Sequence, residues 1–130
     1  MAESRAITFV AAATVFAVRD VPRSVEHYRD VLGFRVEFTY GEPVFYAGVE
    51  RGGVLIHLQG AGETKRQPGQ GSVYVFVDDV DGLYEELKLR GARILKAPEN
   101  YDYGMRDFDI HDLDGNQLGF GMESKASPTS

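Results

Sequence analysis

Hydrophobic residues follow the same pattern in the two halves of the chain. Each half opens with a strand-like apolar run, continues through Asp-Val into a segment with apolar residues at helical spacing, and then meets a glycine. The helical positions are Val21, Val25, Tyr28 and Leu32 in the first half, and Val80, Leu83, Tyr84 and Leu87 in the second. Each segment therefore predicts one helix with a single buried face.

The residues that flank these two segments are typical of helix ends. Asp20 and Asp79 stand where an N-cap carboxylate accepts the unpaired N–H groups of the first turn. Pro22 fits the start of the first helix, where a missing N–H costs nothing. Gly33 and Gly91 are placed to end the helices, because glycine readily adopts the left-handed conformation found there.

Apolar runs bounded by turn residues predict four strands in each half. They span 7–18, 34–40, 44–50 and 54–59, and then 72–77, 92–95, 105–110 and 117–122. Each half reads βαβββ, so the predicted fold class is α+β, with two tandem modules of mostly antiparallel strands. The chain is predicted to form a single domain over 1–123, with module one at about 8–60, a linker at 61–71, module two at about 72–123 and a flexible tail at 124–130.

The first apolar run has an alternative interpretation. Residues 7–18 follow Arg5 and superficially resemble the apolar part of a signal peptide. The run is too short to span a membrane, and it also fits the opening strand of the repeat. The strand is therefore the preferred interpretation.

Alternate residues of each strand face opposite sides of the sheet, and one set is suited to pack on the helices. The other set is small, polar or aromatic; it comprises Ala13, His57, Ser72, Tyr74, Phe76, Gln117, Gly119 and Gly121. Glycine inside a strand often marks the close approach of a ligand or another backbone. The pattern therefore predicts a ligand-binding cleft on this second face.

The amino-acid composition excludes several classes of partner and site. The net charge of −6 argues against nucleic acid, which is bound through a surplus of Lys and Arg, and leaves cationic or neutral ligands as the better fit. The chain contains no cysteine, which excludes disulfides, zinc-thiolate sites and thiol catalysis. Cytoplasmic location and no membrane association are the resulting expectations.

Two motifs carry a resemblance to a known family. Tyr28 to Phe34 reads Tyr-Arg-Asp-Val-Leu-Gly-Phe, and Asp112 to Leu118 reads Asp-Leu-Asp-Gly-Asn-Gln-Leu. Together with the two βαβββ units, they resemble the vicinal oxygen chelate superfamily of glyoxalases, bleomycin-resistance proteins and ring-cleaving dioxygenases. The resemblance covers about Val10 to Glu123. It implies two curved half-sheets around a cavity and a homodimer.

Enzymes of this superfamily bind a divalent metal through His or Glu at four strand positions. By the resemblance, these positions fall on Ala13, His57, Ser72 and Gly119, so one of the four carries a metal-binding side chain. About three protein ligands are needed for a catalytic ion, so no metal and no cofactor are expected. This departure makes the chain similar to the drug-sequestering, bleomycin-resistance-like branch.

Eight residues are the candidate ligand contacts: Phe45, His57, Tyr74, Phe76, Tyr101, Tyr103, Arg106 and Gly119. The alternatives are that His57 is hydrogen-bonded within the sheet, that the aromatic residues pack in the core, and that Arg106 forms an ion pair with a nearby Asp. No catalytic residue is assigned.

Several other polar residues are predicted to be structural or solvated. His27 lies off the apolar helical face and is expected in solvent, and His111 is expected to be structural. The acids Asp107, Asp109 and Asp112 are interpreted as a solvated face. Asp112 to Asn116 is interpreted as a tight hairpin turn, since its glycine does not match the spacing of a calcium loop.

The function predicted first is binding and sequestration of a planar or cationic antibiotic-like molecule without metal. The alternative is a lyase or dioxygenase-like enzyme with a non-standard metal or acid/base site around His57. A third possibility is a subunit or regulatory module with a vestigial pocket, which a cavity smaller than roughly 300 Å³ would indicate.

Overall fold

A computed structural model describes residues 6–124. The first module contains β1 (Ala13–Val18), α1 (Val21–Asp30), β2 (Arg35–Tyr40), β3 (Tyr46–Arg51) and β4 (Val54–Gly60). A short 3-10 turn (Ala61–Glu63) leads into the connection to the second module. That module contains β5 (Ser72–Phe76), α2 (Val80–Leu89), β6 (Arg93–Asn100), β7 (Met105–His111) and β8 (Gln117–Glu123). The predicted tail lies outside the described residues, apart from Ser124.

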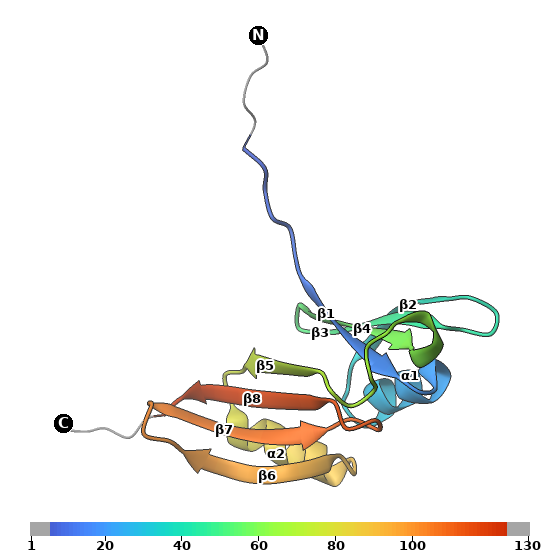
Figure 1. The fold of residues 1–130 in the computed structure, drawn as a ribbon. Coiled ribbons are helices and arrows are strands. Elements are labelled where there is room, and N and C mark those ends of the chain that lie inside the picture. The colour runs from blue at the N-terminus through green and yellow to red at the C-terminus, as the bar shows by residue number, and fades with distance from the viewer. Residues whose placement is uncertain (1–5, 125–130) are drawn as a thin grey trace.

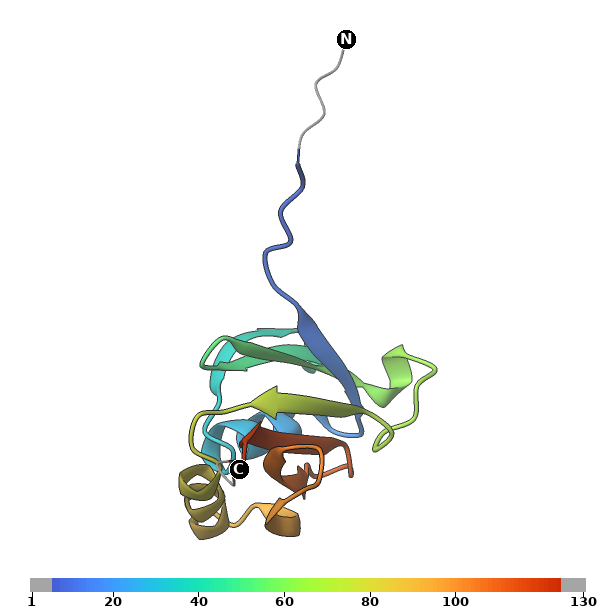
Figure 2. The ribbon, with the colours of Figure 1, turned by 90° about the vertical axis from the view of Figure 1, so that its left-hand side faces the viewer.

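The strands form two four-stranded mixed sheets with matching topology. Their orders are β1-β4-β3-β2 and β5-β8-β7-β6; β1 and β5 pair in parallel with β4 and β8, and the other pairs are antiparallel. This confirms the α+β class and the two βαβββ modules. Figures 1 and 2 show the sheets one above the other, with β5 on the side of its module that faces the first module.

The helix ends have the predicted local causes. The Asp20 carboxylate accepts a hydrogen bond from the Arg23 N–H at 3.1 Å, and Asp79 accepts one from the Gly82 N–H at 2.9 Å. Gly33 and Gly91 follow the helices with φ of 77° and 90°, a conformation that a Cβ would strain. The sequence signals for both helices are thus confirmed.

Two strands differ in length from the prediction. The first strand begins at Ala13 and not at Ile7, because residues 6–12 extend beyond the partner strand β4. The sixth runs to Asn100 and not to Leu95, although it contains Pro98. It tolerates this proline because β6 lies at a sheet edge and its register with β7 shifts twice.

The aliphatic strand faces pack on the helices as predicted. Phe16, Ile56 and Leu58 of the first sheet, and Phe108 and Leu118 of the second, are at most 1% exposed. These side chains belong to one continuous apolar cluster that includes residues of both modules. Within the described residues, no helix has the length and apolar character needed to cross a membrane.

A buried polar cluster joins the first helix to the last hairpin. The Tyr28 hydroxyl donates to Asp112 Oδ2 at 2.9 Å, and the Asn116 amide donates to the same oxygen and to the Ala17 carbonyl. Gly115 has φ of 95°, which confirms a hairpin turn between β7 and β8. Asp112 is 1% exposed, so its interpretation as a solvated acid was wrong; it organises the turn and binds α1.

A second polar contact joins the modules on the other side. Arg51, at the end of β3, donates to both carboxylate oxygens of Glu86 on α2 at 2.9 Å, and also to the Leu32 carbonyl. The hydrogen bonds from Arg51 lower the pKa of Glu86 more than burial raises it. Both charged side chains remain about one-third exposed.

His27 is buried, which corrects the prediction that it lies in solvent. It is 9% exposed, and its Nε2 has no hydrogen-bond partner among the described residues. Burial lowers its pKa, against the attraction of Asp112. The helical-face argument failed because α1 is covered by the second module as well as by its own sheet.

Candidate functional site

The side of the second sheet that faces away from α2 carries a cluster of aromatic and charged side chains. We call it the aromatic face; it comprises Tyr74, Phe76, Lys96, Tyr101, Tyr103, Asp107, Asp109, Gly119 and Gly121. Strand register brings these residues together: Tyr74 lies opposite Gly119, which lies opposite Asp109, which lies opposite Lys96. The predicted residues Tyr74, Phe76, Tyr101, Tyr103 and Gly119 all belong to it.

Asp107 is the centre of the hydrogen bonds on this face. Its Oδ2 accepts from the hydroxyls of Tyr74 at 2.9 Å and Tyr103 at 3.1 Å, and its Oδ1 accepts from Lys96 Nζ at 2.7 Å. The residue is 4% exposed, so its interpretation as a solvated acid was also wrong. A buried carboxylate is stable here because three donors satisfy it.

The charges of this cluster are fixed at neutral pH. Burial would raise the pKa of Asp107, but the hydrogen bonds from Lys96, Tyr74 and Tyr103 outweigh it and hold that pKa below its usual value. Burial, followed by the bond to Asp107, raises the pKa of Tyr74 to about 12. Burial would lower the pKa of Lys96, but the hydrogen bonds to Asp107 and Tyr101 outweigh burial, so the pKa lies above its usual value. Lys96 is therefore a fixed cation and unsuited to act as a base.

Gly119 and Gly121 of β8 leave room for the Tyr74 ring, which lies against them. A Cβ added at Gly121 would collide with the Tyr74 hydroxyl and ring, and one at Gly119 would lie 3.1 Å from that ring. The ring thus lies flat across two residues without side chains. The room left by these glycines holds the Tyr74 ring, which is itself 42% exposed.

Tyr101 and Tyr103 extend the face along its edge. Their rings are parallel within 6°, with centroids 5.3 Å apart. Lys96 Nζ lies 4.3 Å from the Tyr101 ring centroid and donates to the Tyr101 hydroxyl. Tyr74, Phe76 and Tyr103 remain 42%, 75% and 66% exposed. The structure therefore presents accessible ring surface whose polar atoms are already paired.

The corresponding side of the first sheet holds His57. We call it the histidine face; it comprises Phe38, Tyr46, Gly48 and His57. His57 Nδ1 is 2.9 Å from the Tyr46 hydroxyl, and its ring meets the Phe38 ring edge to face with centroids 5.3 Å apart. A Cβ at Gly48 would collide with the Phe38 ring. In each sheet, therefore, one aromatic ring packs against glycine: Phe38 in the first and Tyr74 in the second.

The four strand positions that the resemblance assigns to a metal do not fit one. Ala13 and His57 share a face of the first sheet, and Ser72 and Gly119 share a face of the second. His57 is the single imidazole or carboxylate of that set, and its Nδ1 is bonded to Tyr46. Residues 6–124 contain no group of three or more His, Asp or Glu that could hold a metal ion.

Two predicted contacts lie elsewhere. Phe45 lines a shallow hollow with Pro22 and Gly60, at the start of α1, and packs edge to face on Tyr40. Arg106 donates to both oxygens of Asp81 at 3.0 and 2.7 Å, and also to Asn100. The ion pair considered as an alternative for Arg106 is therefore the one observed.

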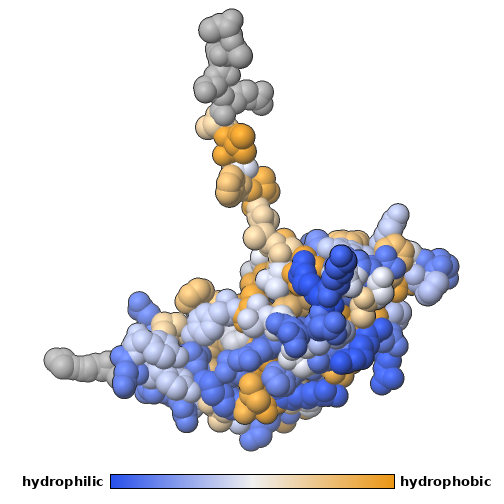
Figure 3. All heavy atoms as spheres, viewed as in Figure 1, coloured by the Kyte–Doolittle hydropathy of each residue, from blue (hydrophilic) through white to orange (hydrophobic). Residues whose placement is uncertain are grey.

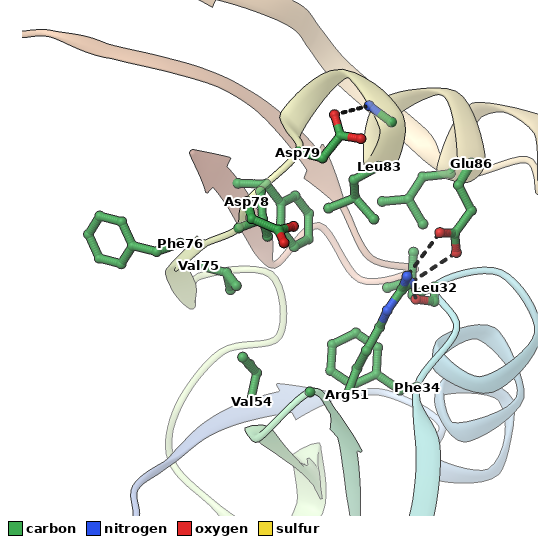
Figure 4. A pocket seen from close by; sticks show the side chains of 15 residues that line it. Leu32, Phe34, Arg51, Val54, Val75, Phe76, Asp78, Asp79, Leu83 and Glu86 are labelled. Atoms are coloured by element: carbon green, nitrogen blue, oxygen red, sulfur yellow. Dashed lines mark hydrogen bonds and ion pairs between the residues drawn. The ribbon is translucent and has the colours of Figure 1, made fainter. Parts of the chain in front are cut away.

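A hollow lies between the modules and not over either face. Its volume is about 780 Å³, and its apolar walls include Leu32, Phe34, Val54, Val75, Leu83 and Leu87. Figure 4 shows Val54 of the first module and Val75 of the second on opposite sides of it, with the Arg51–Glu86 pair at one end. We call it the inter-module hollow. It shares Phe76 with the aromatic face.

Sequence reasoning missed Phe38 and Lys96 and misplaced Asp107. A signal was present for the acid: Asp107 and Asp109 alternate with the buried Phe108 and Ile110, so they share one side of β7. No signal existed for Lys96, because two register shifts separate β6 from a regular alternation with β7.

The chain is similar in sequence to a known protein family. The model of the Glyoxalase/Bleomycin resistance protein/Dioxygenase superfamily matches residues 10–120. A search of curated protein sequences finds no significant match.

Solved structures share the fold over nearly the whole chain. TioX from Micromonospora sp. ML1 has a TM-score of 0.79 at 23% identity, with 89% of this chain and 100% of that chain covered. The bleomycin-binding protein of Streptomyces verticillus, in complex with copper(II)-bleomycin, has a TM-score of 0.75 at 26% identity, with 92% and 100% covered. Lactoylglutathione lyase from Agrobacterium tumefaciens has a TM-score of 0.72 at 20% identity, with 90% and 95% covered. With the matched family model and the two βαβββ modules, the chain belongs to the glyoxalase/bleomycin resistance protein/dioxygenase superfamily.

Proposed function

We propose that this protein binds and sequesters a planar, partly cationic, antibiotic-like small molecule on the aromatic face, without a metal ion of its own. The observation that carries the proposal is the accessible ring surface of Tyr74, Phe76 and Tyr103. Hydrogen bonds to the buried Asp107 hold Tyr74 and Tyr103 in place, and Phe76 packs on Tyr74. The similarity to a protein crystallised with copper(II)-bleomycin supports the same class of ligand.

The geometry favours a flat guest. Tyr103 already stacks on Tyr101 on one side, so a further ring placed on its exposed side would continue the stack at the offset distances that aromatic pairs prefer. Tyr74 and Phe76 meet edge to face with centroids 5.3 Å apart and add a second ring surface. Stacking of this kind needs no movement of the paired hydroxyls.

The charge of the molecule favours a guest with a positive group. The chain carries a net charge of −6. On the face itself, Lys96 is paired with Asp107 at 2.7 Å, while Asp109 lies 3.9 Å from Lys96 and is the less tightly held acid. A cationic group beside Asp109 would gain an attractive partner without breaking the Asp107 cluster.

Two further expectations belong to the proposal. The aromatic face is an open surface in a single chain, since Tyr74 and Tyr103 are 42% and 66% exposed and neither lines the inter-module hollow. A homodimer, which the resemblance implies, would supply the missing cover. Location in the cytoplasm also remains a prediction.

A thermal-shift screen against planar antibiotics and divalent metals tests this function directly. A guest that binds the folded state raises the melting temperature in proportion to its saturation. We expect at least one planar cation to raise it and divalent metals alone to leave it unchanged. Elemental analysis that finds one divalent ion per chain after dialysis would contradict the metal-free proposal.

The alternative function is an enzyme with an acid/base site at His57. The observation that favours it is the Tyr46–His57 hydrogen bond of 2.9 Å, because it fixes the imidazole through Nδ1 and leaves Nε2 to exchange a proton. The test is turnover of candidate lyase substrates by the wild type, by His57→Ala and by Tyr46→Phe. Equal rates in all three proteins would remove this alternative.

A further inference from the structure

The inter-module hollow takes no part in the proposed function, apart from the Phe76 ring that it shares with the aromatic face. Its volume of about 780 Å³ lies within the range of small-molecule sites, roughly 300–1,000 Å³. Aliphatic side chains from both modules form most of its apolar wall: Leu32, Val54, Val75, Val77, Leu83 and Leu87. The hollow is therefore suited to a compact apolar body.

The lining of this hollow carries more negative than positive charge. Its charged residues are Arg51, Asp78, Asp79 and Glu86. Arg51 donates to both carboxylate oxygens of Glu86, so these two side chains balance each other. Asp79 accepts the Gly82 N–H as the cap of α2, and neither it nor Asp78 forms an ion pair within residues 6–124. Two carboxylates are thus left without a cation.

Asp78 is the carboxylate that is available to a ligand. It lies in the link between β5 and α2, directly after Val77, whose N–H donates to the Gly121 carbonyl. The residue is exposed and makes no hydrogen bond with residues 6–124. Figure 4 shows its carboxylate apart from the Arg51–Glu86 pair, with Leu83 between them in this view. The apolar wall therefore leads to an acid without a partner.

The opposite side of the second module has a different character. Figure 3 shows the side on which the strands lie in front of α2 as largely hydrophilic, with hydrophobic residues in small separate groups. An aliphatic body placed there would leave most of its surface in water, whereas the hollow covers it from both modules. For an aliphatic ligand, the hollow is the better site of the two.

We propose that the inter-module hollow is a second binding site, which takes a small aliphatic amine or quaternary ammonium compound. The aliphatic body lies against the wall that includes Val54, Val75 and Leu83, and the cationic group lies beside Asp78. This inference goes beyond the proposed function, since it uses neither ring stacking nor the Asp107 cluster.

The charges favour a cation over an anion. Arg51 is already bound to Glu86 at two points, so an anionic head group would have to displace Glu86 and would face Asp78 and Asp79. A neutral aliphatic molecule would gain the apolar wall but no attraction to Asp78. Specificity therefore comes from the acid, and most of the affinity comes from burial of the apolar body.

Isothermal titration calorimetry of the full chain with octyltrimethylammonium and octyl sulfate tests the site. The two probes have the same alkyl chain and opposite charges, and both are used below the concentration at which they form micelles. We expect one octyltrimethylammonium to bind per chain, with an affinity at least about fivefold above that of octyl sulfate. Hexyltrimethylammonium should bind up to roughly fifteenfold more weakly, because each buried methylene contributes up to about fourfold.

Two results of this titration would overturn the proposal. Equal affinity for the two octyl probes would show that Asp78 does not select a cation. A wild type that binds neither probe would show that the hollow is closed to ligands, as it would be if a segment of this chain or of a second copy filled it.

Asp78→Asn tests the position of the cationic group. We expect it to weaken octyltrimethylammonium binding roughly two- to fivefold, the range of an exposed ion pair. Glu85→Gln is the matched control, because it also removes one negative charge from an exposed position of the second module but does not line the hollow. Equal weakening in both variants would assign the attraction to net charge and contradict the site.

Val54→Trp tests the apolar part of the site by filling the hollow. Val54 is partly buried in the wall that the first module contributes. A larger side chain there should weaken octyltrimethylammonium binding by roughly tenfold or more, because the alkyl chain loses its place. A cooperative thermal transition shows that the variant folds, and unchanged binding in a folded variant would contradict the proposal. If Val54→Trp does not fold, Asp78→Asn still decides, since its position is exposed.

Tyr103→Ala separates this site from the aromatic face, because Tyr103 does not line the hollow. If this variant lost octyltrimethylammonium binding, the probe would lie on the aromatic face and the inference would be wrong. A chain that binds the alkyl cation beside Asp78 and binds no planar guest would retain this inference while contradicting the proposed function.

Discussion

The buried contact between Tyr28 and Asp112 allows a quantitative test of how the modules hold together. The hydroxyl donates at 2.9 Å to a carboxylate that also accepts hydrogen bonds from the Asp114 and Asn116 N–H groups and from the Asn116 amide. Tyr28→Phe removes one of these four donors and keeps the ring, which packs edge to face on Phe34. Because both side chains are at most 1% exposed, water cannot replace the lost donor.

The expected loss follows from these contacts. A hydrogen bond to a buried charged group contributes about 1.5–3 kcal/mol. Since three donors remain on Asp112, we expect a loss near the lower end, about 1.5 kcal/mol, which corresponds to a fall in melting temperature of roughly 6 °C in a domain of this size. Tyr84→Phe is the control, because it removes the same hydroxyl from a partly buried ring, and the Tyr84 hydroxyl makes no hydrogen bond among the described residues.

Urea unfolding followed by circular dichroism measures both variants. We expect Tyr84→Phe to change the unfolding free energy by less than about 0.5 kcal/mol, within the range of mutations that remove no specific interaction. If Tyr28→Phe were as mild as this control, the Tyr28–Asp112 bond would not join the modules in solution, and the reasoning would fail.

Three further predictions concern the faces of the second module. Gly121→Ala would place a Cβ against the Tyr74 ring, so we expect a loss of about 1–3 kcal/mol by urea unfolding, and an unchanged midpoint would show that the ring does not rest there. The pKa of Tyr74 is raised to about 12, so the stabilisation linked to its neutral hydroxyl is fully present below pH ~10 and is lost as the pH rises towards 12. An ultraviolet titration of tyrosinate should therefore lose a late component in Tyr74→Phe; a difference centred near pH 10 would refute this. Arg106→Ala should leave guest affinity within about twofold, because Arg106 is paired with Asp81 away from the aromatic face.

The sequence was sufficient for the fold because local signals agreed with the repeated pattern. Asp20, Asp79, Gly33 and Gly91 set the helix ends through backbone chemistry that depends only on neighbouring residues. Strand alternation likewise gave the helix-facing side of most strands, since the period of two is fixed by the backbone. These features could be predicted without knowing how the modules meet.

The candidate site was predicted only in part because it depends on contacts between distant residues. The burial of Asp112 results from Tyr28, which is 84 positions away, and the burial of Asp107 results from donors on three other segments. Gly119 and Gly121 were singled out for the space beside them, and the structure places the Tyr74 ring in that space. Arg106 could not be oriented, because its partner Asp81 lies on α2.

The most direct test of the proposed function is a calorimetric titration of the wild type and two variants with copper(II)-bleomycin and with the planar cation that stabilises the protein most. We predict saturable binding that Tyr103→Ala weakens roughly three- to tenfold through loss of ring stacking, and that Arg106→Ala leaves unchanged. Equal affinity in the wild type and Tyr103→Ala, or the absence of binding by every guest, would contradict a ligand site on the aromatic face.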